Sequence, residues 1–582
     1  MSKMRAALGE FVPSPDGRVL VHPQHDQFAY SDGEAVEARI LGLLKETGDL
    51  SIGSAELMAR VEDWPTEYHF SDVRANLLRH LRLEEGMRAL ELGAGCGAIT
   101  RFLGERGCEV VAVEGSLLRA QCARERTRDL PNVAVHCSNF QDVAFSGTFD
   151  VVTLIGVLEY APRFFSGDDP IQACLAVARS ALAPGGTLVV AIENQLGLKY
   201  FAGATEDHLG THYSGIEDRY QPQGVRTMGR RHIEGVLRTA GFTEVAFQYP
   251  FPDYKLPVAV VFEQGLGRDD FRPAEIVRHL YARDYAGKDL HAIDTAQVWP
   301  VLEANGLLGD LSNSFLVLAS GAAARQGLAG PDELLAVTYS AGRARAFQTQ
   351  TQFRLLPDGA ILCEKTRLHP APAAPQGSAA PGMTHRLLRD AYLRGPTLHS
   401  VIGAALRDMK PDLVMARLVQ WRDFLGMAAG AAEGPVSWDT RLPGEYWDCT
   451  PGNLVVSGPE LRYFDAEWIS DPGPRVGHLL LRYLFSLAFS EGTARSFAAC
   501  FADSPGPAIC EIHAQLGMPL DAARLAEFAA DANEKNALIF PLKPLIVLNP
   551  DHFFPAPAPA QRAGARGLAS KVLRRILRAI ER

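Results

Sequence analysis

The chain has 582 residues, of which 47% are hydrophobic and 22% are charged, and its formal net charge is −10. This length exceeds what one hydrophobic core normally holds and predicts two or three globular domains. The acidic charge argues against a general nucleic-acid-binding protein, because surfaces that follow phosphates are normally basic. The nine cysteines include no Cys-x-x-Cys pair, which favours reduced thiols over a zinc site. We find no secretory leader and no apolar run of membrane-spanning length, so we expect a cytoplasmic protein.

Two patterned segments precede the first motif. Residues 32–48, DGEAVEARILGLLKETG, have the apolar spacing of a helix. Residues 64–81, WPTEYHFSDVRANLLRHL, place polar and aromatic side chains before an amphipathic helix. We therefore expect residues 1–64 to form a helical extension that partly covers the domain beginning near residue 65.

The stretch Ala89–Gly97, ALELGAGCG, joins an apolar strand to a turn that is almost without side chains. Such a turn lets a nucleotide-like ligand lie against the backbone. A helical pattern follows over residues 98–107, and a second strand, CEVVAVEGS, ends on Glu114. An acid about twenty residues after the glycines has the spacing expected for a carboxylate that binds ribose hydroxyls. Dinucleotide oxidoreductases share this plan, so they remain an alternative here, as does an inert Rossmann-like domain.

Three further segments continue the pattern in order. They read SNFQDVAF (138–145), FDVVTLIGVLEYAP (149–162) and ALAPGGTLVVAIEN (181–194). With the glycine turn, this order resembles class I S-adenosylmethionine-dependent methyltransferases over residues of about 65 to 195. The resemblance implies that the glycine turn faces the methionyl part of the cofactor, that the acid binds ribose and that the SNF segment flanks adenine. It also implies that Arg74 pairs with the methionine carboxylate, although a surface helix with solvated basic residues would look the same. The cofactor-binding residues so implied are Glu91, Gly93, Gly95, Gly97, Glu114, Asn139, Phe140, Tyr68 and Arg74.

The acceptor is expected in residues 193–220, which follow the carboxyl end of an apolar strand where open parallel sheets place ligands. This segment contains the candidate catalytic residues Lys199, Tyr200, His208 and His212. A hydroxyl acceptor needs a general base, which either histidine could supply, whereas a phosphate acceptor needs only cationic positioning. His208 and His212 have no evident third ligand, so no metal site is predicted there. A polar lid with solvated histidines is the alternative.

Residues 241–263 and 311–321 predict three strands that add an antiparallel edge to this domain. We expect the methyltransferase domain to end near Gly321 and residues 322–333 to form a linker.

A second motif pair follows in EYWDCTPGNLVV (445–456) and ELRYFDAEW (460–468). Phosphoryl transfer needs a carboxylate for the attacking hydroxyl, here Asp448, and ligands for magnesium, here Asn453 and Asp465. The Asp-x-x-Pro-x-Asn form resembles the aminoglycoside phosphotransferase and choline kinase branch, and residues 389–402 resemble its hinge and following helix. The resemblance implies a kinase-like domain over residues 334–550.

The upstream part of this second domain departs from the kinase pattern. Lys365 stands where a kinase keeps its phosphate-binding lysine, but residues 366–389 contain no Asp or Glu. There is also no glycine-rich loop, so we expect Lys365 to lack the carboxylate partner of active protein kinases. An active kinase that uses ATP and Mg²⁺ and a degenerate nucleotide-binding or scaffold domain both remain open.

The C-terminal sequence predicts a Pro/Ala linker over residues 551–566 and a basic amphipathic helix over residues 567–582. Such a helix is typical of an anionic membrane surface, and docking on a partner protein or on the body of the chain is the alternative.

The predicted fold class is α/β: a Rossmann-like seven-stranded methyltransferase domain, then an α+β kinase-like domain with a reduced N-lobe and a C-terminal amphipathic helix. This domain order resembles bacterial bifunctional methyltransferase-kinase proteins that cap O-antigen chains. It implies methylation of a cell-surface glycan or its lipid-linked precursor, at a sugar hydroxyl or a terminal phosphate. It also implies glycosyltransferase partners and a peripheral position at the inner face of the cytoplasmic membrane, without nucleic acid. A small-molecule O- or N-methyltransferase and an assembly scaffold for glycosyltransferases are the alternatives.

Overall fold

The computed structural model divides the chain into two compact units. Unit 1 comprises residues 1–404, 443–473 and 536–543, and unit 2 comprises residues 405–442, 474–535 and 544–582. The residues that the structure describes are 11–14, 17–23, 33–143, 145, 148–288, 290, 292–321, 328–330, 332–340, 342–369, 382–430, 435–490, 492–501, 504–541 and 545–554.

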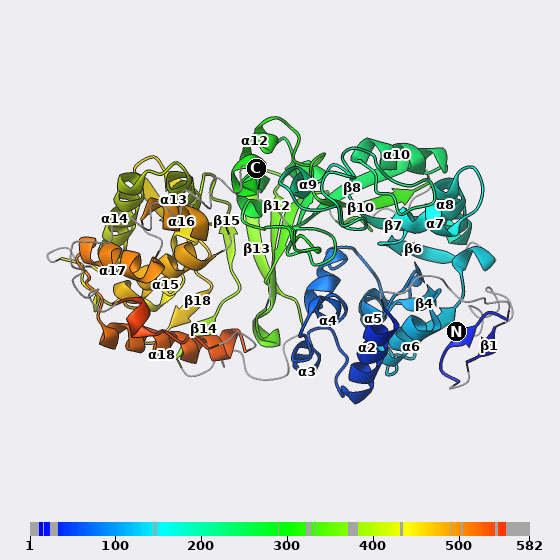
Figure 1. The fold of residues 1–582 in the computed structure, drawn as a ribbon, viewed down its shortest axis with the longest axis horizontal. Helices are drawn as coiled ribbons and strands as arrows, with labels where there is room; N and C mark the ends of the chain where they lie inside the picture. The colour runs from blue at the N-terminus through cyan, green and yellow to red at the C-terminus, as the bar shows by residue number, and fades with distance from the viewer. Residues whose placement is uncertain are drawn as a thin grey trace, which may run out of the picture. The chain divides into compact units, whose positions relative to one another are not determined.

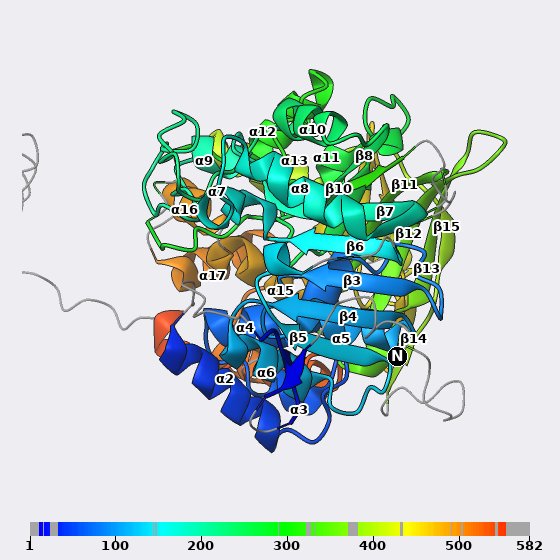
Figure 2. The ribbon, with the colours of Figure 1, turned by 90° about the vertical axis from the view of Figure 1, so that its right-hand side faces the viewer.

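A fourteen-stranded sheet organises unit 1, with the strand order β1-β2-β5-β4-β3-β6-β7-β10-β8-β9-β11-β12-β13-β15. Its strands are β1 (Val12–Pro13), β2 (Leu20–Val21), β3 (Arg88–Leu92), β4 (Glu109–Glu114), β5 (Val133–Cys137), β6 (Phe149–Ile155), β7 (Leu182–Glu193), β8 (Glu244–Phe251), β9 (Ala259–Phe262), β10 (Ser314–Ser320), β11 (Leu334–Tyr339), β12 (Thr349–Leu355), β13 (Ile361–Arg367) and β15 (Arg389–Ala391). Strands β2 to β7 pair in parallel, and Figure 2 shows β7, β6, β3 and β4 side by side.

The parallel strands are apolar along their whole length because helices cover both faces of the sheet. Leu90 and Leu92 of β3 face a core shared with α8 (Pro170–Ala181) and α10 (Arg230–Thr239). Ala89, which precedes Leu90 in the same strand, faces a second core shared with α5 (Ala98–Glu105) and α6 (Leu117–Arg126). Figure 1 labels these helices. This three-layer arrangement confirms the predicted Rossmann-like α/β fold of the first domain.

The first half of the chain contains further helices. They are α2 (Glu34–Glu46), α3 (Ala55–Met58), α4 (Trp64–Phe70), α7 (Ala161–Phe164), α9 (Leu198–Phe201), α11 (Pro273–Val277) and α12 (Thr295–Ala304), with the 3-10 helices η1 (Asp72–Leu77), η2 (Phe140–Asp142), η3 (Leu158–Tyr160) and η4 (Glu263–Gly265). The predicted helix over residues 32–48 is thus confirmed as α2. In residues 64–81, the polar and aromatic part expected before an amphipathic helix itself forms α4, and the 3-10 helix η1 follows it. Asp63 begins α4 with a capping box, since its side chain accepts from Thr66 N–H and the Thr66 side chain caps it in return.

The antiparallel part of the sheet extends further than the sequence predicts. The three expected strands form β8, β9 and β10, and β10 lies between β7 and β8. Strand β9 then pairs with β11, so β11, β12, β13 and β15 continue the same sheet. Lys365 lies in β13.

Smaller elements of unit 1 carry the second motif pair. They are β14 (Met383–His385), β18 (Trp468–Ser470), β16 (Leu454–Ser457), β17 (Glu460–Tyr463), η5 (Arg345–Phe347), η6 (Gly444–Tyr446) and η7 (Pro451–Asn453). Strands β16 and β17 form the predicted hairpin, and β14 pairs with β18. Helix α13 (Leu398–Arg407) begins in unit 1 and ends in unit 2.

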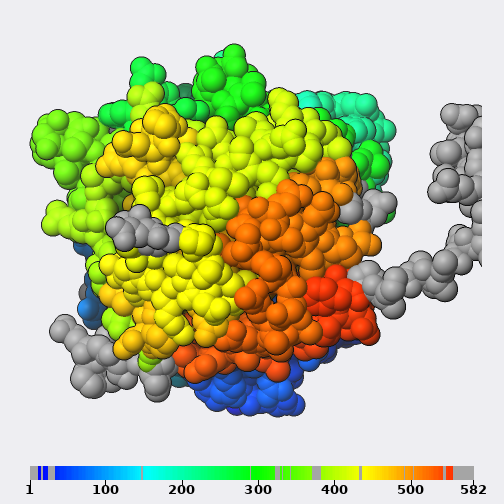
Figure 3. All heavy atoms as spheres, turned by 90° about the vertical axis from the view of Figure 1, so that its left-hand side faces the viewer, coloured from blue at the N-terminus to red at the C-terminus, as the bar shows by residue number. Residues whose placement is uncertain are grey.

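Unit 2 is built from helices around buried leucine and tryptophan side chains such as Trp421 and Leu480. Its helices are α14 (Pro411–Ala428), α15 (Val476–Phe489), α16 (Ala494–Cys500), α17 (Pro505–Gln515), most of α18 (Ala522–Ile539) and the 3-10 helix η8 (Pro550–His552). Figure 3 draws the atoms of this part of the chain as spheres, coloured from yellow-green to red. None of the helices within the described ranges is long and apolar enough to cross a bilayer. The predicted amphipathic helix over residues 567–582 and most of its linker lie outside the described residues.

Candidate active site

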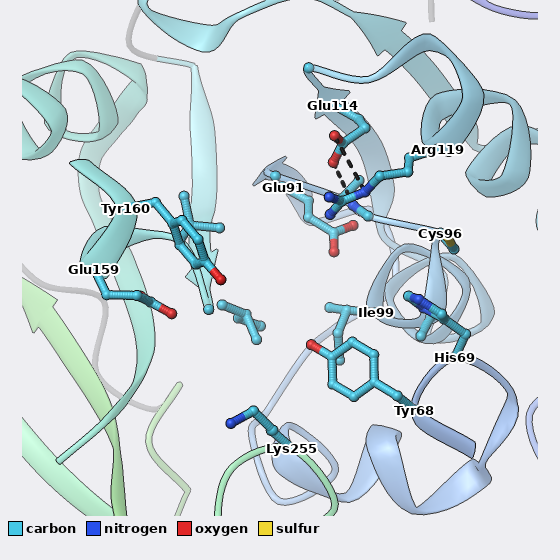
Figure 4. Close-up of a pocket in the computed structure, with 18 of the residues that line it drawn as sticks. Tyr68, His69, Glu91, Cys96, Ile99, Glu114, Arg119, Glu159, Tyr160 and Lys255 are labelled. Atoms are coloured by element: carbon cyan, nitrogen blue, oxygen red, sulfur yellow. Dashed lines mark hydrogen bonds and ion pairs between the residues drawn. The ribbon is translucent and has the colours of Figure 1, made fainter. Parts of the chain in front are cut away.

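A cavity of about 410 Å³ lies at the carboxyl ends of the parallel strands of unit 1. The strand order reverses at this edge between β3 and β6, which is where open α/β sheets bind ligands. In the close-up, Glu159 and Tyr160 enter the cavity from one side and Glu114 with Arg119 from another (Figure 4). The cavity therefore joins residues that follow several different strands.

The glycine turn forms a cradle that side chains would close. Gly93 has a φ of +79°, and a Cβ at this position would lie 2.6 Å from the Val157 side chain. Gly97 has a φ of +83°, and its Cβ would lie 2.6 Å from the Cα of Ala123. At Gly93, which lines the cavity, the backbone can approach a ligand because no Cβ is present, whereas at Gly97 the missing Cβ lets the turn pack against Ala123 of α6. Of the predicted glycines, Gly93 and Gly95 line the cavity and Gly97 is not among the lining residues.

Glu114 is held in place by backbone and side-chain donors. The N–H of Gly95 donates to Glu114 Oε2 at 2.7 Å, and the N–H of Ser116 donates to Oε1 at 3.0 Å. Arg119 lies 3.6 Å from the same carboxylate. A carboxylate has about four acceptor positions, so Glu114 keeps acceptor capacity for ribose hydroxyls. Its orientation fits the role that the resemblance implies.

The predicted adenine-flanking residues also line the cavity. Asn139 Nδ2 donates to Asp142 at 3.1 Å, while Asn139 Oδ1 is buried without a hydrogen-bond partner among the described residues. Phe140 is half-buried and packs near Phe165, with ring centroids 5.5 Å apart. A base that donates hydrogen bonds and stacks on an aromatic ring would fit these groups. The cradle, the carboxylate and this unpaired amide oxygen together fit S-adenosylmethionine.

Arg74 and Tyr68 form one wall of the cavity and contact each other. Arg74 donates to the backbone carbonyls of Tyr254 and Lys255, both at 3.0 Å, and to the Tyr68 hydroxyl at 2.9 Å. Its guanidinium also lies 4.6 Å from the centre of the Tyr68 ring. These contacts fix Arg74 beside the cavity, and its pairing with a methionine carboxylate stays a prediction.

Glu91 lies at the end of β3 and is fully buried. Thr100 Oγ1 donates to Glu91 Oε2 at 2.6 Å, and burial raises the pKa of Glu91 to about 8. Glu91 is therefore largely protonated at neutral pH.

Three polar side chains converge at the end of the cavity that His208, from the predicted acceptor segment, also lines. Glu159 follows β6, Glu193 ends β7 and His208 lies in the loop after α9, and one ligand atom from each lies within 4.8 Å of the others. His208 Nε2 is 3.4 Å from Glu193 Oε2, and the Tyr160 hydroxyl is 3.3 Å from His208 Nδ1. We call Glu159, Glu193 and His208 the acceptor triad.

Two lysines neutralise part of the negative charge around the acceptor triad. Lys255 Nζ donates to Glu193 Oε1 and, at 2.5 Å, to Asp207 Oδ2. Lys199 Nζ donates to the other oxygen of Asp207 at 2.7 Å. Side-chain exposure is 13% for Lys255 and 0% for Glu193, so little water screens this pair.

Burial and neighbouring charges shift the pKa values of the triad in opposite directions. Burial, followed by the negative charge of Glu193, raises the pKa of Glu159 to about 8. Burial alone would raise the pKa of Glu193, but Lys255 and His208 hold it well below its usual range. Burial opposes charge on His208, but Glu193 raises the pKa of His208 to about 9.

The structure separates the four predicted acceptor residues. His208 lines the cavity, whereas Lys199, Tyr200 and His212 are not among the residues that line it. Lys199 contacts the site only through Asp207, and the Tyr200 hydroxyl is buried without a hydrogen-bond partner in the described part of the chain.

Glu159, Glu193 and Lys255 were not predicted as site residues from the sequence. Glu193 is the last residue of an apolar strand and Glu159 lies in the short segment after another, so their position at the carboxyl edge was a usable signal. Lys255 lies in the irregular segment between β8 and β9, and no local sequence pattern indicates that it reaches this edge of the sheet.

A second polar cluster in unit 1 surrounds Lys365 and corrects one expectation. Lys365 was expected to lack a carboxylate partner, but its Nζ donates to Asp465 Oδ1 and to Glu467 Oε2, both at 2.6 Å. Glu467 also accepts from Arg343 at 2.5 Å and lies 3.2 Å from His385 Nε2. Residues 366–389 contain no Asp or Glu, and the carboxylate partner of Lys365 is instead Glu467, which lies just after Asp465 in the chain. Burial alone would raise the pKa of Glu467, but His385, Arg343 and Lys365 hold it well below its usual range.

The other predicted kinase-like residues lie in the same region of unit 1. Asn453 Nδ2 donates to Asp448 Oδ2 at 3.1 Å and to the Asp448 carbonyl at 2.9 Å. The N–H of Phe464 donates to the Asn453 carbonyl at 3.0 Å, which holds Asn453 beside the segment that carries Asp465. Asp465 has a φ of +58°, a left-handed conformation that is costly for a residue with a side chain.

Comparison with known proteins identifies part of the chain. Residues 90–188 match a family model described as a methyltransferase domain. A probable fatty acid methyltransferase of Mycobacterium tuberculosis is 36% identical over 87 residues, covering 14% of this chain and 20% of that protein. The ubiquinone biosynthesis O-methyltransferase of Alkalilimnicola ehrlichii is 32% identical over 114 residues, covering 19% of this chain and 43% of that protein.

Solved structures are more distant. Phosphoethanolamine N-methyltransferase 2 of Haemonchus contortus, in complex with S-adenosyl-L-methionine, is 17% identical with a TM-score of 0.27, covering 44% of this chain and 55% of that one. The chain spans less than half the length of the curated relatives named above. The family match, the strand order and the glycine cradle nevertheless agree: residues 90–188 form part of a Rossmann-like α/β sheet domain and match a methyltransferase domain.

Proposed function

We propose that this protein transfers a methyl group from S-adenosylmethionine to an acceptor held by the acceptor triad. The observation that carries the proposal is one continuous cavity, which the glycine turn and Glu114 line together with Glu159, Glu193 and His208. A methyl donor and an acceptor must meet in one enclosed space for an in-line displacement.

Each part of the cavity has a separate task in this proposal. The cofactor supplies an electrophilic methyl group when it is bound. The glycine turn and Glu114 position it, and Tyr68 and Arg74 cover it from the side. Glu159, His208 and Lys255 hold the acceptor oxygen in line, and the cavity wall excludes water that would compete with that oxygen.

For the acceptor, we propose a cell-surface glycan or its lipid-linked precursor, methylated on a sugar hydroxyl or a terminal phosphate. Hydrogen-bonding groups at this end favour an oxygen-rich acceptor, since Lys255 and His208 both line the cavity. A small-molecule acceptor is the second candidate, and the relative named for ubiquinone biosynthesis favours it.

Transfer of labelled methyl groups distinguishes these acceptors. The full chain would be incubated with methyl-labelled S-adenosylmethionine and either a lipid-linked glycan fraction or simple phenols. Label in the glycan fraction, lost with Glu114→Ala, would support the proposal. Label only in phenols would replace the glycan acceptor, and no transfer to any acceptor would contradict the methyltransferase assignment of the cavity.

We also propose that the cluster around Lys365 binds ATP with Mg²⁺, with Asn453 and Asp465 as metal ligands and Asp448 beside the attacking hydroxyl. The lysine paired with Asp465 and Glu467, and the hydrogen bond between Asn453 and Asp448, support this assignment. A scaffold that recruits glycosyltransferases is the alternative.

Calorimetric titration of Mg²⁺-ATP distinguishes nucleotide binding from the scaffold. Asp465→Ala should remove the heat of binding, whereas Asp358→Ala, at an exposed hairpin turn, should leave it unchanged. Absence of nucleotide binding in the unmodified chain would favour the scaffold.

Peripheral attachment to the inner face of the cytoplasmic membrane completes the proposal. The sequence of residues 567–582 supports it, through five basic side chains on a helical apolar pattern: Lys571, Arg574, Arg575, Arg578 and Arg582. Deletion of these residues should abolish co-sedimentation with anionic vesicles, and retained sedimentation would contradict it.

A further inference from the structure

We propose that the acceptor triad, Glu159, Glu193 and His208, binds one divalent metal ion that holds the acceptor through two adjacent oxygen atoms. This inference rests on the proposed function only in placing the acceptor at this end of the cavity. No metal was predicted here from the sequence, because His208 was paired there with His212 and not with the two glutamates.

The three donors come from separate elements that converge on one point. Glu159 lies in η3, Glu193 is the last residue of β7 and His208 follows α9. Their ligand atoms lie within 4.8 Å of one another. Metal–ligand bonds of about 2.1 Å place two ligand atoms at most ~4.2 Å apart, so movements of a few tenths of an ångström complete the geometry.

The donor atoms are buried and lack hydrogen-bond partners. Neither carboxylate oxygen of Glu159 accepts a hydrogen bond from another described residue, although its side chain is fully buried. Glu193 Oε2 and His208 Nε2 meet no hydrogen-bond geometry within the described ranges, but they lie 3.4 Å apart as an ion pair. Buried polar atoms are normally paired, so the two unpaired oxygens of Glu159 beside this pair indicate a ligand that the protein itself does not supply.

Neighbouring residues hold the donors in a ligating orientation. Lys255 donates to Glu193 Oε1 and leaves Oε2 directed toward His208. The Tyr160 hydroxyl contacts His208 Nδ1, which leaves Nε2 for the ion. Metal-binding histidines and carboxylates usually have such outer partners, because these fix the tautomer and the orientation of the ligand.

One imidazole and two carboxylates suit Mn²⁺, Fe²⁺ or Zn²⁺ better than a thiolate-preferring ion. All three residues line the cavity, so the remaining coordination positions open toward the acceptor. An acceptor with two neighbouring oxygens, such as a vicinal diol or a phosphate, could occupy two of those positions. Such binding would align one oxygen with the methyl donor.

Mn²⁺ binding to the purified full chain, without cofactor or acceptor, tests this site. Electron paramagnetic resonance detects free Mn²⁺, and loss of that signal reports binding. We expect one Mn²⁺ per chain, with affinity reduced at least tenfold in Glu159→Gln and in His208→Gln. The matched control is His232→Gln, because His232 is exposed on α10 and should leave affinity unchanged.

Two outcomes would overturn the site: the absence of stoichiometric Mn²⁺ binding, or binding that only His212→Gln removes. If a variant unfolds, electron spin echo envelope modulation of Mn²⁺ bound to the unmodified protein replaces the affinity measurement. The proposed site predicts that a histidine nitrogen bound to Mn²⁺ appears in that spectrum. Absence of that nitrogen would also overturn the proposal. S-adenosylmethionine titration of the same samples separates failure of the metal site from failure of the proposed function, because Glu159→Gln should still bind the cofactor.

Discussion

The two ends of the cavity are built by different physical means. At the cofactor end, backbone without side chains forms the wall, and one carboxylate is fixed by two backbone N–H groups. At the acceptor end, buried charges from distant segments are held by one another, as in the contacts of Lys255 with Glu193 and Asp207. The backbone end recognises the shape of its ligand and depends little on individual side chains. At the charged end, substitution of a single side chain can change which ligand binds.

Substitution of Gly97 should give the largest combined effect, on stability and on cofactor binding together, and would test the backbone end. In Gly97→Ala the new Cβ meets the backbone of Ala123 at 2.6 Å and the residue keeps an unfavourable φ of +83°. We expect the free energy of unfolding to fall by about 3 kcal/mol and cofactor binding to weaken at least about tenfold. Urea unfolding and calorimetric titration measure both.

Gly86→Ala is the matched control for that substitution. Gly86 has a φ of +81°, but nothing lies within 4 Å of the position that its Cβ would take. Only the conformational cost of about 1 kcal/mol should appear, with cofactor affinity unchanged. Equal losses of unfolding free energy in Gly97→Ala and Gly86→Ala would show that the positive φ, and not the contact with Ala123, makes glycine necessary at position 97.

Substitution of Lys255 should break the charged end without breaking the backbone end. Lys255→Met leaves Glu193 and Asp207 without their shared cation, and we expect a loss of about 3 kcal/mol in unfolding free energy. Cofactor affinity should stay within about fivefold. Lys288→Met, at an exposed lysine, should cost less than about 1 kcal/mol. A parallel loss of cofactor affinity in Lys255→Met would contradict the independence of the two ends.

Acid should destabilise unit 1 through a buried histidine outside the cavity. His80 Nε2 lies 2.6 Å from Gln248 Oε1, and burial lowers the pKa of His80 from 6.5 to about 4. The unfolded chain binds a proton at higher pH than the folded chain, so stability is complete above pH 6.5 and falls as the pH drops toward 4. The loss from this group reaches about 3 kcal/mol. Unfolding between pH 7 and 4 measures it, and an unchanged slope in His80→Gln would contradict the assignment.

Glu91→Gln should give the smallest effect and would sharpen the contrast with Glu114. Because the pKa of Glu91 is raised to about 8, the group is mostly uncharged at pH 7, and glutamine keeps the acceptor for Thr100. We expect changes below about 0.5 kcal/mol in stability and little change in cofactor affinity. A large loss at pH 7 would show that Glu91 acts as a charge.

The cofactor end could be predicted from the sequence because its signals are local. The glycine turn, Glu114 and the SNF segment each lie in short patterns whose structural meaning depends on neighbours in the chain. The acceptor end depends on segments from Glu159 to Lys255 that meet only in the folded sheet. Glu467 was missed as the partner of Lys365 because the partner was sought in residues 366–389, which contain no Asp or Glu, and not in the segment after Asp465. The pairing of β9 with β11 was also missed, since edge pairing leaves little signal in either strand.

The most direct test of the cofactor site is calorimetric titration of S-adenosylmethionine into the purified full chain and into Glu114→Ala. We predict one binding site per chain, with binding lost or weakened at least about tenfold in the variant, because Glu114 is the fixed carboxylate of the cofactor end. Equal binding by both proteins would contradict the proposed position of the cofactor, and no binding by either would contradict the proposal that this chain transfers methyl groups from S-adenosylmethionine.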